Sequence, residues 1–135
     1  YRQKTIITKS MASRDIYDLE KKLQDAFVEA KEKWAYLYPL RAVPFLTCTH
    51  RTNREQEQLF AIGRTIPGKI VTNAKPGQSK HNSLPSKAFD IAFNLYGRID
   101  WDPLLFKDFA DIIKPMGITW GGDFKSIKDR PHFEI

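Results

Sequence analysis

The stretch Ala88-Phe89-Asp90-Ile91-Ala92-Phe93-Asn94 alternates between two kinds of residue along its whole length. Phe89, Ile91 and Phe93 share one face, whereas Asp90 lies on the other face between alanines. Successive side chains of a β-strand point to opposite faces of the sheet, so this alternation predicts a half-buried strand. Asp90 would then project away from the aromatic core, where its small neighbours leave room for a metal ion and a substrate.

Helical patterns precede this strand. Apolar residues at helical spacing predict a helix from Arg14 to Tyr38, with Ser13 as its cap and Pro39 as its stop. Thr52 and Glu55 form the capping-box pattern that opens a second helix, over 52–62. The region from Arg64 to Ser86 is rich in Gly, Pro, Ser and Asn, which predicts a loop with at most a short strand over 70–72.

Further elements follow the strand. Asp102-Pro103 combines a capping acceptor with a proline in the first turn, which predicts a helix that ends at Gly117. Short strands are expected over 43–49, 118–120 and 132–135. A helix-rich first part followed by strands and a helix predicts an α+β fold: a small antiparallel β-sheet with flanking helices.

Composition sets limits on organisation and partners. The 135 residues suit a single domain over 1–135, in which 1–12 form an irregular arm. The formal net charge of +6 favours polyanionic partners, but the basic residues form no reading motif, so nucleic acid is not predicted. No apolar run approaches the length of about 18 residues that spans a membrane, so no membrane insertion is expected. One cysteine, Cys48, excludes an intrachain disulfide.

Two histidines and a carboxylate form the strongest candidate for chemistry. His81 and Asp90 lie in one segment, and His132 lies near the end of the sequence. Two imidazoles and one carboxylate can hold a zinc ion and leave its fourth position to water, as hydrolysis requires. Asp129, three residues before His132, is suitably placed for a general base.

These residues, in this order, resemble a known family: the zinc D-alanyl-D-alanine carboxypeptidases and L-alanyl-D-glutamate endopeptidases, a group with a Hedgehog-like fold. The matching pattern is Ser79 before His81, Ala88 before Asp90, and Asp129 before His132. Further similar segments are Thr49–Gln56, Thr72–His81 and Trp120–Phe124. The resemblance extends from about residue 43 to the end and fits the phage endolysin branch best.

The resemblance implies roles for individual residues. His81, Asp90 and His132 match the zinc ligands, and Asp129 matches the general base. Arg51 matches the arginine that stabilises a developing oxyanion. The substrate contacts implied by the resemblance are Ser79 and Gln56. Trp120 is a further candidate, because it would either line the cleft or fill the core.

The function implied is a zinc-dependent peptidoglycan peptidase of endolysin type. It would hydrolyse the L-alanyl-D-glutamate bond of the stem peptide, with Asp129 deprotonating a zinc-activated water. The alternatives are a D-alanyl-D-alanine carboxypeptidase and a non-catalytic cell-wall binder with a structural zinc. The expected protein is a monomer without a separate cell-wall-binding domain. It would stay in the host cytoplasm until its release to the periplasm and cell wall, or else reside in the cell envelope.

Four further features qualify this picture. His81 and Asp90 are nine positions apart, more than is usual in the family, so an enlarged loop would affect the peptide preference. Cys48, on a predicted strand, is interpreted as a small core residue. His50 is expected to pack or hydrogen-bond. Glu134 shares a strand face with His132, so it would either orient that imidazole or lie at the surface.

Overall fold

The centre of the fold is an antiparallel sheet, seen in a computed structural model that describes residues 12–135. The predicted arm over 1–12 therefore lies almost entirely outside the described residues. The strands are β1 (Val43–Cys48), β2 (Ala88–Leu95), β3 (Arg98–Ile99), β4 (Thr119–Trp120) and β5 (His132–Glu134). Their order is β1-β2-β5-β4, and β3 pairs with β2. The predicted class, α+β with a small antiparallel sheet and flanking helices, is confirmed.

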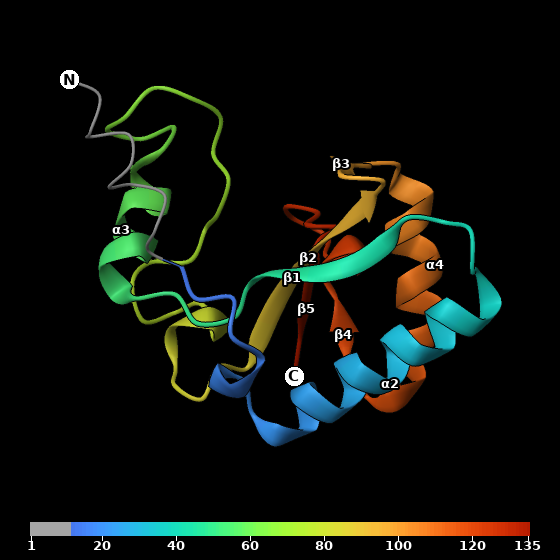
Figure 1. The fold of residues 1–135 in the computed structure, drawn as a ribbon. Coiled ribbons are helices and arrows are strands. Elements are labelled where there is room, and N and C mark those ends of the chain that lie inside the picture. The colour runs from blue at the N-terminus through green and yellow to red at the C-terminus, as the bar shows by residue number, and fades with distance from the viewer. Residues whose placement is uncertain (1–11) are drawn as a thin grey trace.

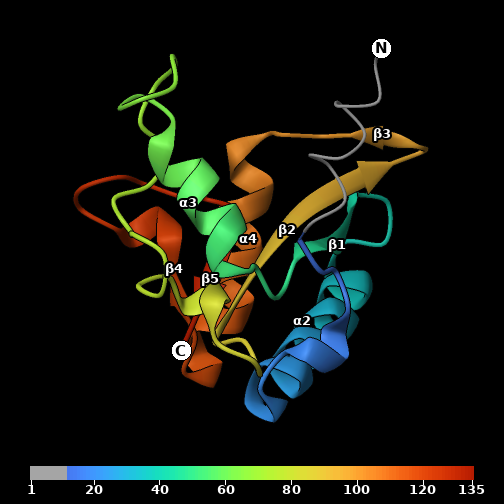
Figure 2. The same ribbon diagram turned by 90° about the vertical axis from the view of Figure 1, so that its left-hand side faces the viewer.

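Two helices, α2 (Lys21–Leu37) and α4 (Pro103–Ile113), cover one face of the sheet. Helix α3 (Asn53–Ala61) and the loop after it lie on the opposite side (Figures 1 and 2). The core between sheet and helices is strongly aromatic; its fully buried members include Phe89, Phe93, Phe109 and Phe133. Phe133 stacks on Phe89 at a centroid distance of 5.4 Å. Replacing such a side chain with alanine typically costs about 3–5 kcal/mol, so β5 is firmly held.

The helix starts follow the expected capping chemistry. Thr52 accepts a hydrogen bond from the backbone N–H of Glu55, and the Glu55 carboxylate accepts one from the backbone N–H of Thr52. Asp102 caps α4 by accepting from the backbone N–H of Leu104, and Pro103 is the first helical residue. Both predicted caps are confirmed.

The first helix begins later than predicted. Asp15 caps a single 3₁₀ turn, η1 (Ile16–Asp18), and α2 starts only at Lys21 rather than at Arg14. Between them, Leu19 forms a β-bridge with Ser86, which holds this part of the chain in an extended conformation. Local helical spacing could not reveal this contact, because its two residues are far apart in the sequence.

Three further 3₁₀ turns join the main elements: η2 (Lys80–Asn82), η3 (Lys114–Met116) and η4 (Gly121–Asp123). Of the loop predicted over 64–86, residues 64–79 form neither a helix nor a regular strand, whereas 80–82 form η2. No strand forms over 70–72. Within residues 12–135, no helix combines the length and the apolar character needed to cross a membrane.

Candidate metal centre and cleft

Strand pairing brings three functional side chains into one row. Cys48 of β1 lies opposite Asp90 of β2, and Asp90 lies opposite His132 of β5. The β1–β2 register is irregular between Leu46 and Cys48. Asp90 follows the fully buried Phe89, so the alternation of β2 directs it to the face away from α2 and α4. The row therefore combines residues that are widely separated in the sequence.

His81 reaches this row from η2. Ser79 caps the turn by accepting from the backbone N–H of His81, and the Asn82 side chain accepts from the backbone N–H of Ser79. Nδ1 of His81 donates to the Thr49 carbonyl at 2.9 Å, because a carbonyl oxygen can only accept. Nε2 of the same ring lies 3.2 Å from Oδ1 of Asp90. The Thr49 contact thus orients the ring so that Nε2 faces the cluster.

His132 faces Asp90 with Nδ1, whereas His81 faces it with Nε2. Its Nδ1 lies 3.2 Å from Oδ1 of Asp90, and its Nε2 lies 2.7 Å from Oε1 of Glu134. The two imidazoles meet edge to face with a centroid distance of 5.1 Å. His81 and His132 therefore converge on the same carboxylate oxygen from different elements. Of the two roles predicted for Glu134, the structure shows the contact with His132.

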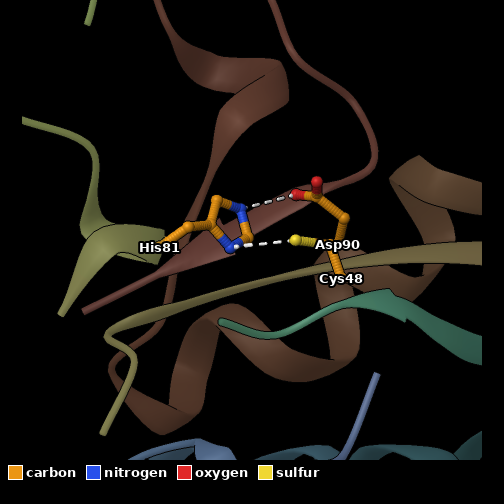
Figure 3. A group of neighbouring side chains, drawn as sticks. All are labelled: Cys48, His81 and Asp90. Atoms are coloured by element: carbon orange, nitrogen blue, oxygen red, sulfur yellow. Dashed lines mark hydrogen bonds and ion pairs between the residues drawn. The ribbon is translucent and has the colours of Figure 1, made fainter. Parts of the chain in front are cut away.

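Two overlapping groups of three donors could hold a metal among residues 12–135. One consists of Cys48, His81 and Asp90 (Figure 3), and the other of Asp90, Asp129 and His132. Within each group the donor atoms lie within 4.8 Å of one another. The predicted ligand trio is thus divided between the groups, with Asp90 common to both. His50 belongs to neither group.

The donor chemistry fits a zinc ion bound by His81, Asp90 and His132, since imidazole and carboxylate are usual zinc ligands. Cys48 is less suited to join them. Its Sγ lies 3.6 Å from Nδ1 of His81, the nitrogen that already donates to Thr49, and the thiol is buried. A metal bound through Cys48 and that nitrogen would replace the Thr49 contact, whereas binding through Nε2 preserves it.

The carboxylate and the two imidazoles stabilise one another's charged forms. Burial by itself raises the pKa of Asp90, but the hydrogen bonds from His132 and His81 hold it well below its ordinary range. Burial by itself lowers the pKa of both imidazoles. The hydrogen bond and charge of Asp90 nevertheless raise it to about 10 for His81 and, with help from Glu134, to about 9 for His132.

Asp129 lies beside this cluster, at the wall of a cavity of about 590 Å³ that His81, Asp90 and His132 also line. Burial and the nearby charge of Asp90 raise the pKa of the Asp129 carboxyl. Its backbone is packed directly against Gly121, where an added Cβ would overlap the Asp129 carbonyl. Gly121 therefore permits the close approach that places Asp129 near His132.

Arg51 also reaches the cluster. Its guanidinium lies 3.5 Å from Oδ2 of Asp90, and it donates to Oε1 of Gln56 at 3.1 Å. Gln56 is fully buried and does not line the cavity; its amide nitrogen donates to the Ala74 carbonyl. The substrate contact predicted for Gln56 is therefore not available to this side chain, which instead fixes Arg51.

The two other predicted substrate contacts differ in position. Ser79 lines the main cavity, although its hydroxyl oxygen is also the cap of η2. Trp120 does not line that cavity. It lines a second cavity together with Leu104. Its Nε1 donates to the Arg130 carbonyl at 2.8 Å. Trp120 also packs against the core, so the cleft position predicted as one of its two alternatives is not the one observed.

Two contributors were not identified from the sequence. Cys48 is buried, as predicted, but its thiol also contacts His81 and Arg51. The Thr49 carbonyl orients His81, but a backbone acceptor carries no signal in its residue type. Only the pairing of β1 with β2, together with the position of η2, brings these groups to the site.

The chain is similar to known proteins in sequence and in fold. Residues 72–135 match a family model described as D-alanyl-D-alanine carboxypeptidase, and this segment contains His81, Asp90, Asp129 and His132. The peptidoglycan L-alanyl-D-glutamate endopeptidase CwlK of Bacillus subtilis is 37% identical over 98 residues, which cover 63% of this chain and 56% of CwlK. The chain thus spans about half the length of this curated relative.

A solved structure, the L-Ala D-Glu endopeptidase ChiX of Serratia marcescens, matches with a TM-score of 0.65 over 94% of this chain and 87% of that chain. At 17% identity this likeness supports the fold. The shared fold is an α+β domain, and in this chain its histidine and aspartate donors lie on the face of the sheet away from α2 and α4. Over residues 72–135 the chain is similar to the D-alanyl-D-alanine carboxypeptidases of peptidase family M15.

Proposed function

We propose that this protein is a zinc-dependent peptidoglycan peptidase that hydrolyses the L-alanyl-D-glutamate bond of the stem peptide. The observation that carries the proposal is the convergence of His81 and His132 on Asp90, with Asp129 in the same donor group. The printed activity of CwlK, which is 37% identical over the aligned residues, supports this choice of scissile bond.

His81, Asp90 and His132 would hold the zinc through Nε2, a carboxylate oxygen and Nδ1, respectively. A zinc ion there would supply Lewis-acid chemistry, polarising the scissile carbonyl and lowering the pKa of a water molecule. The protein's own contribution is to orient its ligands, since Thr49 and Glu134 occupy the outer nitrogens of the two rings.

Asp129 would act as the general base. Its carboxylate shares the cavity with the candidate ligands and belongs to the donor group of Asp90 and His132. It would accept a proton from the attacking water on a carboxylate oxygen and pass it to the amine of the leaving group. Burial and the charge of Asp90 raise its pKa, which strengthens it as a base.

Arg51 would stabilise the negative charge that develops on the carbonyl oxygen. A guanidinium stays positively charged at any pH relevant to a protein, and the contacts with Gln56 and Asp90 hold it in place. A cation fixed before the reaction needs no reorganisation as the charge forms. Ser79, at the same cavity, would contact the peptide.

The biological setting belongs to the same proposal. We propose an endolysin of phage type that acts as a monomer, stays in the host cytoplasm and reaches the cell wall on release. The net charge of +6 supports approach to an anionic wall polymer.

One alternative has a specific observation in its favour. The matching family model is described as D-alanyl-D-alanine carboxypeptidase, and the proposed machinery would serve that reaction equally well. A non-catalytic wall binder is disfavoured, because a binder would not need the carboxylate of Asp129 beside the ligands.

Digestion of purified peptidoglycan, followed by mass spectrometry of the products, tests these possibilities. The proposal expects fragments with a new amino terminus on D-glutamate and no reaction after complete chelation. Release of free D-alanine would instead identify a carboxypeptidase. Hydrolysis that survives complete metal removal would overturn the zinc proposal. The Asp129→Asn variant is the matched control for contaminating hydrolases.

A further inference from the structure

The two candidate histidine ligands are supported by different acceptors. The outer nitrogen of His81, Nδ1, donates to a neutral carbonyl, that of Thr49, at 2.9 Å. The outer nitrogen of His132, Nε2, donates to the carboxylate of Glu134 at 2.7 Å. A carboxylate acceptor forms a shorter and stronger hydrogen bond than a neutral one and adds a negative charge next to the ligand.

The sheet fixes the position of Glu134 relative to His132. Residues 132 and 134 alternate with the fully buried Phe133, so both side chains leave β5 on the same face. The backbone of Glu134 is paired on both sides, with Ala88 of β2 and with Thr119 of β4. Its carboxylate lines the main cavity, yet only 21% of the side chain is exposed. The position of this acceptor is therefore fixed by the sheet.

We propose that Glu134 is a positioning residue that holds His132 with its proton on Nε2 and its Nδ1 lone pair directed at the metal position beside Asp90. A neutral imidazole carries one proton, and a carboxylate accepts but does not donate. The Glu134 contact therefore selects the tautomer in which Nδ1 is free to bind. This role rests on the proposed zinc function and deepens it, because no direct contact of Glu134 with metal or substrate is required.

Substitutions separate the two contributions of Glu134. Glu134→Gln keeps an oxygen acceptor at the same length but removes the charge. Glu134→Ala removes both the acceptor and the charge. Since outer partners of this kind typically contribute about 10- to 100-fold to metal affinity, we expect a loss near the lower end for glutamine and near the upper end for alanine.

The control is Asp123→Asn. Asp123 is another acidic residue of the C-terminal part of the chain, and it pairs with Lys114 at 2.6 Å rather than with a histidine. The variant removes the same formal charge as Glu134→Gln but leaves the contacts of His132 intact. Its zinc affinity should stay within about twofold of the unmodified protein, because the charge of Asp123 is exposed to solvent and compensated by Lys114.

The experiment measures zinc affinity by competition with a chromophoric chelator, using the full chain and zinc alone as the probe. Heteronuclear NMR of the labelled imidazole nitrogens in the zinc-loaded protein supplies a second readout. It should show His132 bound through Nδ1 with a proton on Nε2, and this signature should be lost or mixed in Glu134→Ala. Circular dichroism of the metal-free variants checks their folding, and Glu134→Gln carries the test if Glu134→Ala does not fold.

Unchanged zinc affinity in both folded variants, or an unchanged His132 signature in Glu134→Ala, would overturn the role of Glu134 alone. Failure of the unmodified protein to bind zinc would overturn the proposed function together with this role. The assignment would be supported by a loss of zinc affinity that is largest in Glu134→Ala, smaller in Glu134→Gln and absent in Asp123→Asn.

Discussion

Asp90 and His132 lie directly opposite each other in the β2–β5 pair, and Nδ1 of the imidazole approaches Oδ1 of the carboxylate to 3.2 Å. Because both side chains leave the sheet on the face away from the aromatic core, their distance is set by strand register. A shift of one residue in that register would turn either side chain into the core. The relative position of these two donors is thus fixed by the sheet.

Substitution of Cys48 distinguishes the two donor groups. In Cys48→Ala we expect zinc affinity to stay within about threefold of the unmodified protein, because the thiol contacts the His81 nitrogen that faces Thr49. A chelator competition measures this directly. A loss of several hundredfold would instead show that Cys48 is itself a ligand.

Substitution of Asp129 tests the general base. Asp129→Asn should lower kcat by about 10²- to 10⁴-fold while zinc stays bound, since the amide cannot accept the proton. Turnover on a defined muropeptide and metal content by atomic absorption provide the two measurements. Because burial raises the pKa of this carboxyl, activity of the unmodified enzyme should be lost on acidification at a pH above that expected for an ordinary aspartate. Full turnover in the variant would contradict the assignment.

Gly121 provides a test of the close approach beside Asp129. In Gly121→Ala the new Cβ would overlap the Asp129 carbonyl and lie 3.0 Å from Cβ of His132. We expect a loss of about 1–3 kcal/mol in the free energy of unfolding and a fall in kcat as Asp129 is displaced. Gly97→Ala is the control: its backbone φ of +83° is unfavourable for alanine, but open space surrounds it. That variant should lose stability without losing kcat.

Zinc binding should release protons. In the metal-free protein the pKa is raised to about 10 for His81 and to about 9 for His132, so both rings are positively charged, with a proton on each nitrogen, at neutral pH. Ligation requires the neutral ring, so apparent zinc affinity should rise with pH until these values are passed. Calorimetric titrations near pH 7 in buffers of different ionisation enthalpy measure the release. Binding without proton exchange would exclude the imidazoles as ligands.

Stability of the metal-free protein should follow the opposite trend. The raised pKa values of His81 and His132 mean that their charged forms stabilise the fold. This stabilisation is fully present below the ordinary histidine pKa of 6.5 and is lost as the pH rises through about 9 and about 10. The lowered pKa of Asp90 means that its charged form stabilises the fold. This stabilisation is fully present above the ordinary aspartate pKa of 3.8 and is lost on acidification. Urea unfolding should therefore show a lower free energy of unfolding near pH 10 than near pH 6. Equal values would contradict the imidazole–carboxylate pairing.

Much of the local structure could be predicted from the sequence. The alternation in β2, the Thr52–Glu55 capping box and the Asp102–Pro103 helix start are local patterns, and each is observed. The start of α2 was not predictable, because Leu19 is held in an extended conformation by a bridge to Ser86. The position of Trp120 was likewise undecided until its indole was seen to bind the Arg130 carbonyl at the second cavity.

The sequence by itself determined which donors are present and the face on which Asp90 must lie, because residue chemistry and a period of two are local properties. Only the tertiary structure decided which nitrogen of each imidazole faces the cluster. That choice depends on which acceptor binds the other nitrogen of each ring. The acceptor is the Thr49 carbonyl for His81 and the Glu134 carboxylate for His132. The tertiary structure also decided that Gln56 is buried and accepts a hydrogen bond from Arg51, because packing depends on segments that meet only when the chain is folded.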